Sequence, residues 1–203
     1  MRRATAEFVA VVATGAVFLV FENVLDQKLL FIAVAAVAWL AYVALRFRSP
    51  GQAREWGFRA DNLRPALAAN GIVVLVAAAA LVAYGAAHGR GLPPAGFFYL
   101  IAIYPIWGLV QQFLLCALVC GNLVRATERA GLAVGASALL FGLVHLPDWT
   151  LVLLTFAGGL AWCAIYVRVP NLFVQGVAHG LLGALAYYEV LGRDPWTELF
   201  GPR

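Results

Sequence analysis

The sequence has few charged residues: 12% of its 203 residues are Asp, Glu, Lys or Arg, whereas 64% are hydrophobic. Ordinary soluble domains carry about twice that share of charge, and they cannot bury so much apolar surface. The scarcity of charge therefore excludes a typical water-soluble fold. Because a transmembrane helix needs about 20 apolar residues, a chain of this length predicts a single integral membrane domain over residues 1–203.

Cysteine is also scarce. Cys116, Cys120 and Cys163 all lie inside apolar runs, where cysteine is a buried packing residue more often than a disulfide partner. No small-residue cleavage site follows the first apolar run, which leads to Phe21-Glu22-Asn23, so we interpret this run as a retained span and not as a removed secretion signal.

Seven apolar runs follow one another along the chain, and they predict an all-α fold, a polytopic transmembrane helical bundle of about seven spans. The fourth run is unusually long, which allows it to tilt, and it contains Pro105, which allows a kink. The runs are Phe8–Leu25, Leu29–Leu45, Pro65–Ala87, Phe97–Val124, Leu132–Leu146, Leu151–Val167 and Leu172–Leu191.

The basic residues predict the orientation of these spans, because cytoplasmic loops usually carry the excess of positive charge. With the N-terminus inside, ten of the 14 basic residues face the cytoplasm and four face outward. The strong preference for arginine over lysine and the high alanine content suggest a bacterial source, and hence the bacterial cytoplasmic membrane. The basic residues form loops and not a stripe with exposed aromatics, so the net charge of +4 gives no support for nucleic-acid binding.

Polar groups at membrane depth are costly, and they persist mainly where they face a cavity or a partner. Glu7 lies one helical turn beyond Arg3, which predicts a local ion pair. Glu22 and Asn70 lie near the ends of spans, where we expect their side chains to reach water.

Four other polar residues lie deeper in the predicted spans. Gln111 and Gln112 are adjacent in the fourth run, roughly 20 Å from either end at 1.5 Å per residue. His145 and His179 lie on two later runs. The glutamines are candidates for hydrogen bonds that hold helices together. Equally, two histidines that can exchange protons near neutral pH, with the glutamines, are candidates for one converging site.

The order and spacing of these residues resemble the CPBP family, the CAAX proteases and bacteriocin-processing enzymes. Its pattern is Glu-Glu-x-x-x-Arg in one helix, Phe-x-x-x-His in a later helix and His-x-x-x-Asn in a still later one. The second part is intact here from Phe141 to His145. The third part keeps His179 but has Gly183 where asparagine is usual.

The first part of the family pattern is altered. It corresponds by position to Gln111-Gln112-Phe113-Leu114-Leu115-Cys116, so glutamine replaces both glutamates and cysteine replaces the arginine. The resemblance covers roughly residues 97–191. It implies a multi-span helical intramembrane endopeptidase that acts on membrane-associated proteins or peptides, with a site formed by Gln111, Gln112, His145 and His179.

In this family a glutamate of the first part is thought to activate water, while the histidines and the asparagine orient that water and stabilise the oxyanion. Glutamine cannot accept a proton at physiological pH, so Gln111 can orient a water but cannot act as its base. Loss of a positioned base typically costs a factor of about 10² to 10⁴ in rate. A mechanism with His145 or His179 as the base stays open.

Three functions remain open. The first is a CAAX-type endopeptidase, and the second is a non-catalytic family member that binds a membrane protein or peptide in the former active-site cavity. The third is a small transporter component, for which the halves of the chain offer no matching pair of broken spans. We expect no cofactor. A zinc site of Cys116, Cys120, His145 and His179 would suit tetrahedral coordination, but it lacks the usual closely spaced cysteine pair.

Overall fold

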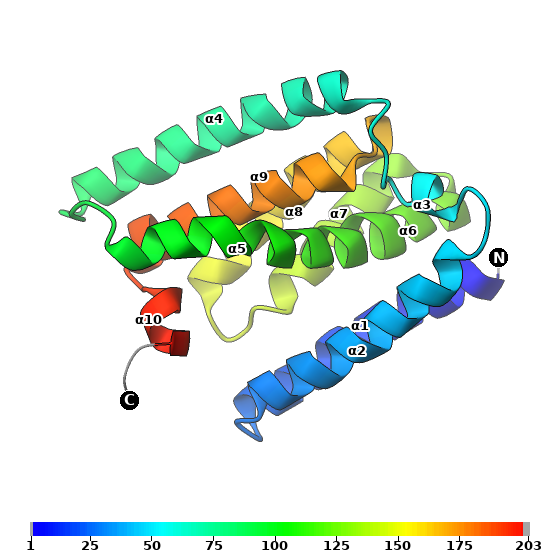
Figure 1. Ribbon diagram of the computed structural model, residues 1–203, viewed down its shortest axis with the longest axis horizontal. Helices are drawn as coiled ribbons and strands as arrows, with labels where there is room; N and C mark the ends of the chain where they lie inside the picture. Colours follow the sequence, from blue (N-terminus) through cyan, green and yellow to red (C-terminus); the bar gives the residue numbers. More distant parts are fainter. Residues whose placement is uncertain (1, 201–203) are drawn as a thin grey trace. The chain divides into compact units, whose positions relative to one another are not determined.

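The computed structural model describes residues 2–200, with the backbone alone for residues 199 and 200, and all regular elements in this range are helices (Figure 1). The predicted all-α fold is confirmed. Five helical segments are long and apolar enough to cross a membrane, which identifies an integral membrane protein. These segments are Arg2–Asn23, Lys28–Phe47, Leu63–Ala87, Ala95–Thr127 and Trp149–Arg168.

The predicted count of about seven spans is not confirmed, although all seven apolar runs are helical. The fifth run forms helix α7 (Ala130–Leu143), which has only 14 residues. The seventh run forms helix α9 (Leu172–Leu185), also of 14 residues, and continues as the π-helix η2 (Ala186–Leu191).

The helices pack into two compact units, and the chain passes between them repeatedly. The first unit comprises the chain up to residue 59 and residues 114–170, and the second comprises residues 60–113 and the chain from residue 171 onward. The predicted single domain stays a prediction. Helices of the first unit are α1 (Arg2–Asn23), α2 (Lys28–Phe47), α3 (Gln52–Glu55), most of the π-helix η1 (Phe113–Cys120), α6 (Gly121–Thr127), α7 and α8 (Trp149–Arg168). Those of the second are α4 (Leu63–Ala87), α5 (Ala95–Gln112), α9, η2 and α10 (Pro195–Phe200).

Glycine brings α5 and α9 of the second unit into close contact (Figure 1). A Cβ atom at Gly108 would fall 2.4 Å from the carbonyl oxygen of Gly176, and one at Gly180 would fall 2.5 Å from the backbone nitrogen of Pro105. Residues on α5 rise in number as their partners on α9 fall, so the helices are antiparallel. Small residues four apart, here Gly176 and Gly180, are typical of such helix contacts in membranes.

Helix α4 runs beside α9 in the same direction. Asn171 caps α9, because its Oδ1 accepts from the backbone N–H of Val174 at 3.1 Å. The same side chain donates from Nδ2 to Oδ1 of Asn62, directly before α4, at 2.8 Å. At the other end, a Cβ atom at Gly85 would collide with the carboxylate of Glu189 in η2. These contacts fix the register of α4 along α9 and η2.

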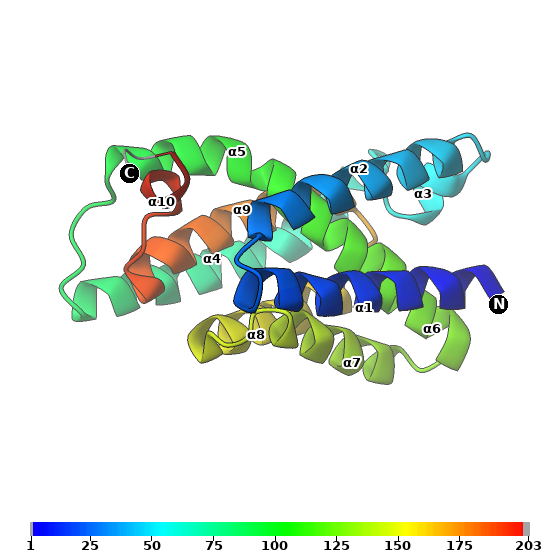
Figure 2. The same cartoon turned by 90° about the horizontal axis from the view of Figure 1, so that it is seen from below.

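In the first unit, α7 and α8 form an antiparallel hairpin that is visible in both views (Figure 2). Small residues again allow the close contact, since a Cβ atom at Gly159 would lie 3.0 Å from the Cα atom of Ala138. Asp148 begins α8 as its N-cap, and its Oδ1 accepts from the N–H of Leu151 at 3.0 Å. The four residues 144–147 therefore form a short connection between α7 and this cap.

A buried carboxylate joins α1 to its neighbours in the first unit. Glu7 is 4% exposed, and Arg3 lies 3.3 Å from it, one turn earlier, so the predicted ion pair is confirmed. Glu7 also accepts hydrogen bonds from the hydroxyl of Tyr42 on α2 and, at 2.9 Å, from Nδ2 of Asn122 on α6. The ion pair is therefore one part of a polar network that links three helices.

The other local predictions have mixed outcomes. Cys116, Cys120 and Cys163 are buried and form no disulfide, as predicted. Glu22 is half-buried and pairs with Lys28. The expectation that Asn70 reaches water is wrong, because this residue is 1% exposed and lies more than one turn inside α4. Its Nδ2 instead donates to the carbonyl oxygen of Ala66 at 2.9 Å, which satisfies half of the amide within its own helix.

Candidate functional site

Gln112 and His179 form a hydrogen-bonded pair inside the second unit. Gln112 is the last residue of α5 and is fully buried, and His179 on α9 is 6% exposed. The Nε2 atom of Gln112 lies 2.9 Å from Nδ1 of His179. The close α5–α9 contact makes this possible, because Gly108 and Gly176 carry no side chains that would separate the helices. The glycine contact therefore positions the polar pair.

The direction of this hydrogen bond determines which ring nitrogen of His179 carries the proton. As the amide of Gln112 is oriented, its nitrogen faces the ring, and an amide nitrogen can only donate. In this orientation Nδ1 of His179 accepts, and the proton of the neutral imidazole lies on Nε2. In this state the ring is a hydrogen-bond donor at Nε2. Its basic nitrogen, Nδ1, is occupied by Gln112. A carboxylate at position 112 would instead accept from Nδ1, which would reverse the positions of proton and lone pair on the ring.

Tyr104 fills the space next to Gly183, the position where the family pattern has asparagine. A Cβ atom at Gly183 would lie 2.8 Å from Cε1 of Tyr104 and 3.8 Å from Cδ2 of His179. Tyr104 is half-buried on α5, and its ring contacts that of Tyr187 edge to face, with 6.3 Å between centroids. Sequence reasoning missed Tyr104, because nothing in its own segment indicates that it lies one turn from His179 across a helix contact.

The sequence predicted His145 inside a helical span, and this is wrong. The residue lies just past the end of α7, in the connection to α8. Its Nδ1 lies 2.8 Å from the carbonyl oxygen of Phe141, which can only accept, so Nδ1 carries the proton of the neutral ring. The rings of Phe141 and His145 contact each other edge to face, with 5.2 Å between centroids. The basic nitrogen of His145 is therefore Nε2, the opposite assignment to that of His179.

The structure thus pairs two of the four predicted site residues. Gln112 and His179 are in direct contact, whereas the side chain of Gln111 is half-exposed and makes no hydrogen bond within residues 2–200. His145 belongs to the first unit, and its membership of a common site stays a prediction. Among the described residues, no group of three or more His, Cys, Asp or Glu side chains is arranged to hold a metal ion.

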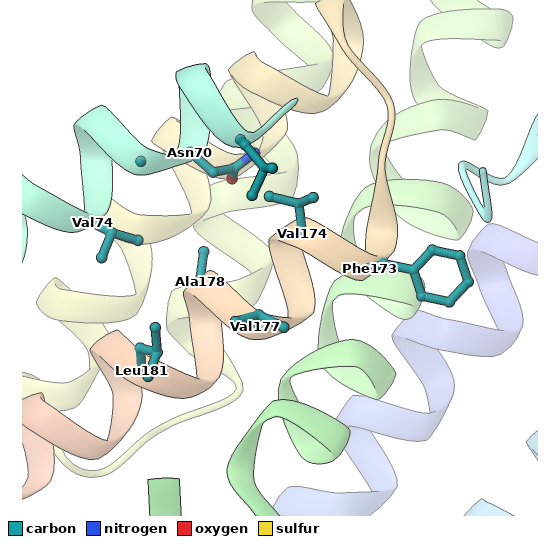
Figure 3. Close-up of a pocket in the computed structure, with 9 residues that line it drawn as sticks. Asn70, Val74, Phe173, Val174, Val177, Ala178 and Leu181 are labelled. Atoms are coloured by element: carbon teal, nitrogen blue, oxygen red, sulfur yellow. The ribbon is translucent and has the colours of Figure 1, made fainter. Parts of the chain in front are cut away.

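An apolar groove of about 300 Å³ lies between α4 and α9 (Figure 3). Asn70 is the only residue of its lining with a polar side chain, and His179 is not part of the lining, because it lies on the face of α9 that contacts α5. Apolar grooves of this kind accept hydrocarbon chains or apolar side chains. The remaining lining residues are Leu67, Gly71, Val74, Phe173, Val174, Val177 and Leu181.

Residues 117–185 match a protein family described as Type II CAAX prenyl endopeptidase Rce1-like. The family resemblance is confirmed. The Rce1-like segment includes His145, His179 and Gly183, and it begins after Gln111 and Gln112. The glutamine pair therefore lies outside the matched segment. Neither the curated proteins nor the solved structures contain a match to this chain.

Proposed function

We propose that this protein binds membrane-associated proteins or peptides through the Gln112–His179 pair, without the water-activating base of a CAAX endopeptidase. The hydrogen bond of 2.9 Å between these residues is the observation that carries the proposal. It holds His179 as a donor at Nε2, which suits a peptide carbonyl oxygen. It also occupies the basic nitrogen of this ring with a group that cannot accept a proton. The arrangement supports recognition of a carbonyl more than activation of water.

The apolar groove between α4 and α9 supports a membrane-associated ligand. Its lining contributes hydrocarbon contacts along α4 and α9. A ligand with an apolar chain and a peptide bond, such as a prenylated C-terminal peptide, offers one group to the groove and one to His179. This ligand class also agrees with the matched family, which is that of the Type II CAAX prenyl endopeptidases.

Slow hydrolysis is a second candidate, and the tautomer of His145 favours it. Because Nδ1 of His145 donates to Phe141, its Nε2 is free of a proton in the neutral ring and is able to serve as a general base. This function requires that His145 joins the Gln112–His179 pair in the working protein. Without a carboxylate base, we expect turnover about 10² to 10⁴ times slower than that of an intact enzyme.

One experiment separates these functions. The purified protein in liposomes is mixed with a fluorescent prenylated peptide that ends in a CAAX sequence, and binding is read by anisotropy and cleavage by mass spectrometry. We expect binding that weakens about tenfold in His179→Ala, since one hydrogen bond to a carbonyl is lost. Cleavage by the wild type that stops in His145→Ala would instead establish the hydrolase.

The glutamines supply the matched pair of variants for this assay. Gln112→Glu and Gln111→Glu each restore one carboxylate of the family pattern, but only position 112 contacts His179. We expect Gln112→Glu to produce the larger gain in cleavage. Equal inactivity of both variants and of the double variant, with binding intact, supports a protein that only binds. Absence of any binding by the wild type would refute the proposal.

We further propose that the protein lies in a bacterial cytoplasmic membrane with its N-terminus inside. The excess of ten basic residues over four supports this orientation. The network around Glu7 agrees with it, because it gathers basic residues from the start of α1 and the end of α6 on one side of the first unit.

A further inference from the structure

Glu189 is a buried carboxylate near the end of η2, and it is 7% exposed. A Cβ atom at Gly85 would fall 1.7 Å from its Oε2, so the carboxylate lies directly against the backbone of α4. Throughout residues 2–200, no hydrogen-bond donor and no cationic side chain contacts it. Its oxygens are not among the fully enclosed side-chain atoms that lack a partner, and the residue lines a pocket, so a cation that is not part of this chain can reach the carboxylate.

The helix ends around Glu189 favour a cation as that partner. Gly85 lies in the last turn of α4, and Glu189 itself lies in the last turn of η2. The C-terminal end of a helix carries partial negative charge from its unsatisfied carbonyl groups, and it attracts cations. A carboxylate between two such ends increases the negative potential there.

Arg90 supplies a positive charge on the same side of the second unit. Gly192 has a φ of +62°, and a Cβ atom there would fall 2.4 Å from Nη1 of Arg90, so the guanidinium lies on the bare backbone of Gly192. Its Nη2 donates to the carbonyl oxygen of Val190 at 3.5 Å. No carboxylate within the described chain pairs with Arg90.

The other charged residues nearby already have partners. Arg193 donates two hydrogen bonds to Glu198, at 2.9 and 2.8 Å. Asp194 accepts from the hydroxyls of Tyr188 and Thr197. Burial raises the pKa of Asp194, but these hydrogen bonds outweigh it and hold the pKa below its ordinary value, so this carboxylate stays ionised and engaged. Glu189 and Arg90 are therefore the two opposite charges left for a ligand.

Both of these residues line a pocket of about 230 Å³ between the loop after α4 and the loop after η2. Aromatic side chains surround this end of the second unit. Tyr188 lines the pocket, and the ring centroid of Trp196 lies 4.9 Å from that of Tyr99. Tyrosine and tryptophan concentrate at the depth of lipid headgroups. The pocket thus opens where headgroups are found.

We propose that this pocket binds the phosphoethanolamine headgroup of a membrane lipid, with the ammonium at Glu189 and the phosphate at Arg90. A primary ammonium donates hydrogen bonds to a carboxylate, whereas the quaternary ammonium of choline cannot. A purely anionic headgroup would satisfy Arg90 but leave Glu189 without a counterion. Phosphatidylethanolamine is the common bilayer lipid that carries both a primary ammonium for Glu189 and a phosphate for Arg90.

Native mass spectrometry of the full chain tests this site. The purified protein is exchanged into equal amounts of phosphatidylethanolamine, phosphatidylcholine and phosphatidylglycerol with identical acyl chains, and the retained lipid is identified. We expect phosphatidylethanolamine to be retained about tenfold over the other two, the typical effect of one charge-assisted hydrogen bond. Glu189→Gln should abolish its advantage over phosphatidylcholine, and Arg90→Gln should lower retention of all three lipids.

Matched substitutions on the first unit serve as controls: Glu22→Gln and Arg168→Gln change the same charges at residues that do not line the pocket. Unchanged selectivity in Glu189→Gln would overturn the proposal, and so would a preference for phosphatidylglycerol that depends on Arg90 alone. Soluble glycerophosphoethanolamine carries the same polar group without chains. If glycerophosphoethanolamine displaces the lipid at an equal concentration, the assignment to a lipid is overturned. Peptide binding at His179 is measured separately, so either proposal can fail without the other.

Discussion

The Cα atom of Pro105 lies so close to Gly180 that a Cβ atom at position 180 would fall 2.7 Å from it. The atoms that this Cβ would meet belong to the backbone of α5, which cannot move aside as a flexible side chain can. The contact determines how near α5 and α9 approach, and hence whether Gln112 reaches His179.

Gly180→Ala should therefore destabilise the second unit. An added methyl in a closely packed contact typically costs about 1 to 3 kcal/mol, because the helices must separate. Thermal unfolding in detergent micelles measures the effect. Gly71→Ala is the matched control, since its Cβ atom would meet nothing within 4 Å and alanine is the better helix former. A Gly180→Ala protein as stable as wild type would show that α5 and α9 are not in contact.

Gly183→Asn should lower stability and should not create activity by itself. The asparagine restores a residue of the family pattern, but its Cβ atom would fall 2.8 Å from the ring of Tyr104. The double variant Gly183→Asn with Tyr104→Ala removes this overlap. We expect the double variant to be more stable than the sum of the two single changes predicts. The free energies of unfolding of the wild type, the two single variants and the double variant measure this difference. Strict additivity would contradict the contact.

The sequence predicted the helices well because bilayer chemistry leaves few alternatives. Backbone groups in hydrocarbon must be satisfied within a helix, so a run such as Leu29–Leu45 becomes α2 with small shifts at its ends. The number of spans was harder to predict. In the run at 132–146 the helix ends at Leu143 and a turn follows. There the carbonyl oxygen of Phe141 accepts a hydrogen bond from the ring of His145.

The site was predictable only in part. Gln112 and His179 could be named from their polarity in apolar runs, but which of two adjacent glutamines contacts the histidine depends on how α5 faces α9. That facing is set by Gly108 and Gly176, whose packing involves residues distant in sequence. Glu189 was overlooked, although a carboxylate two residues before the end of an apolar run was itself a signal.

Glu7→Leu should destabilise the first unit by about 1 to 3 kcal/mol, because the polar groups of Asn122 and Tyr42 lose an acceptor in a buried place. Glu22→Leu on the same helix is the control. Its pair with Lys28 is half-exposed, and such pairs contribute about 0 to 1 kcal/mol. The measurement is the free energy of unfolding of each variant in the same detergent. An equal loss in both variants would contradict a special role for the buried network.

Gln112→Leu and Gln111→Leu separate the buried glutamine from the half-exposed one. Leucine at position 112 removes the donor to Nδ1 of His179, and an unsatisfied buried acceptor costs about 1 to 3 kcal/mol. Leucine at position 111 removes no hydrogen bond of the described chain, so its effect should stay within about 0.5 kcal/mol. Unfolding measures both, and nuclear magnetic resonance of ¹⁵N-labelled histidine reports the ring itself. We expect Gln112→Leu alone to shift the Nδ1 resonance of His179, because only that substitution changes what this nitrogen accepts.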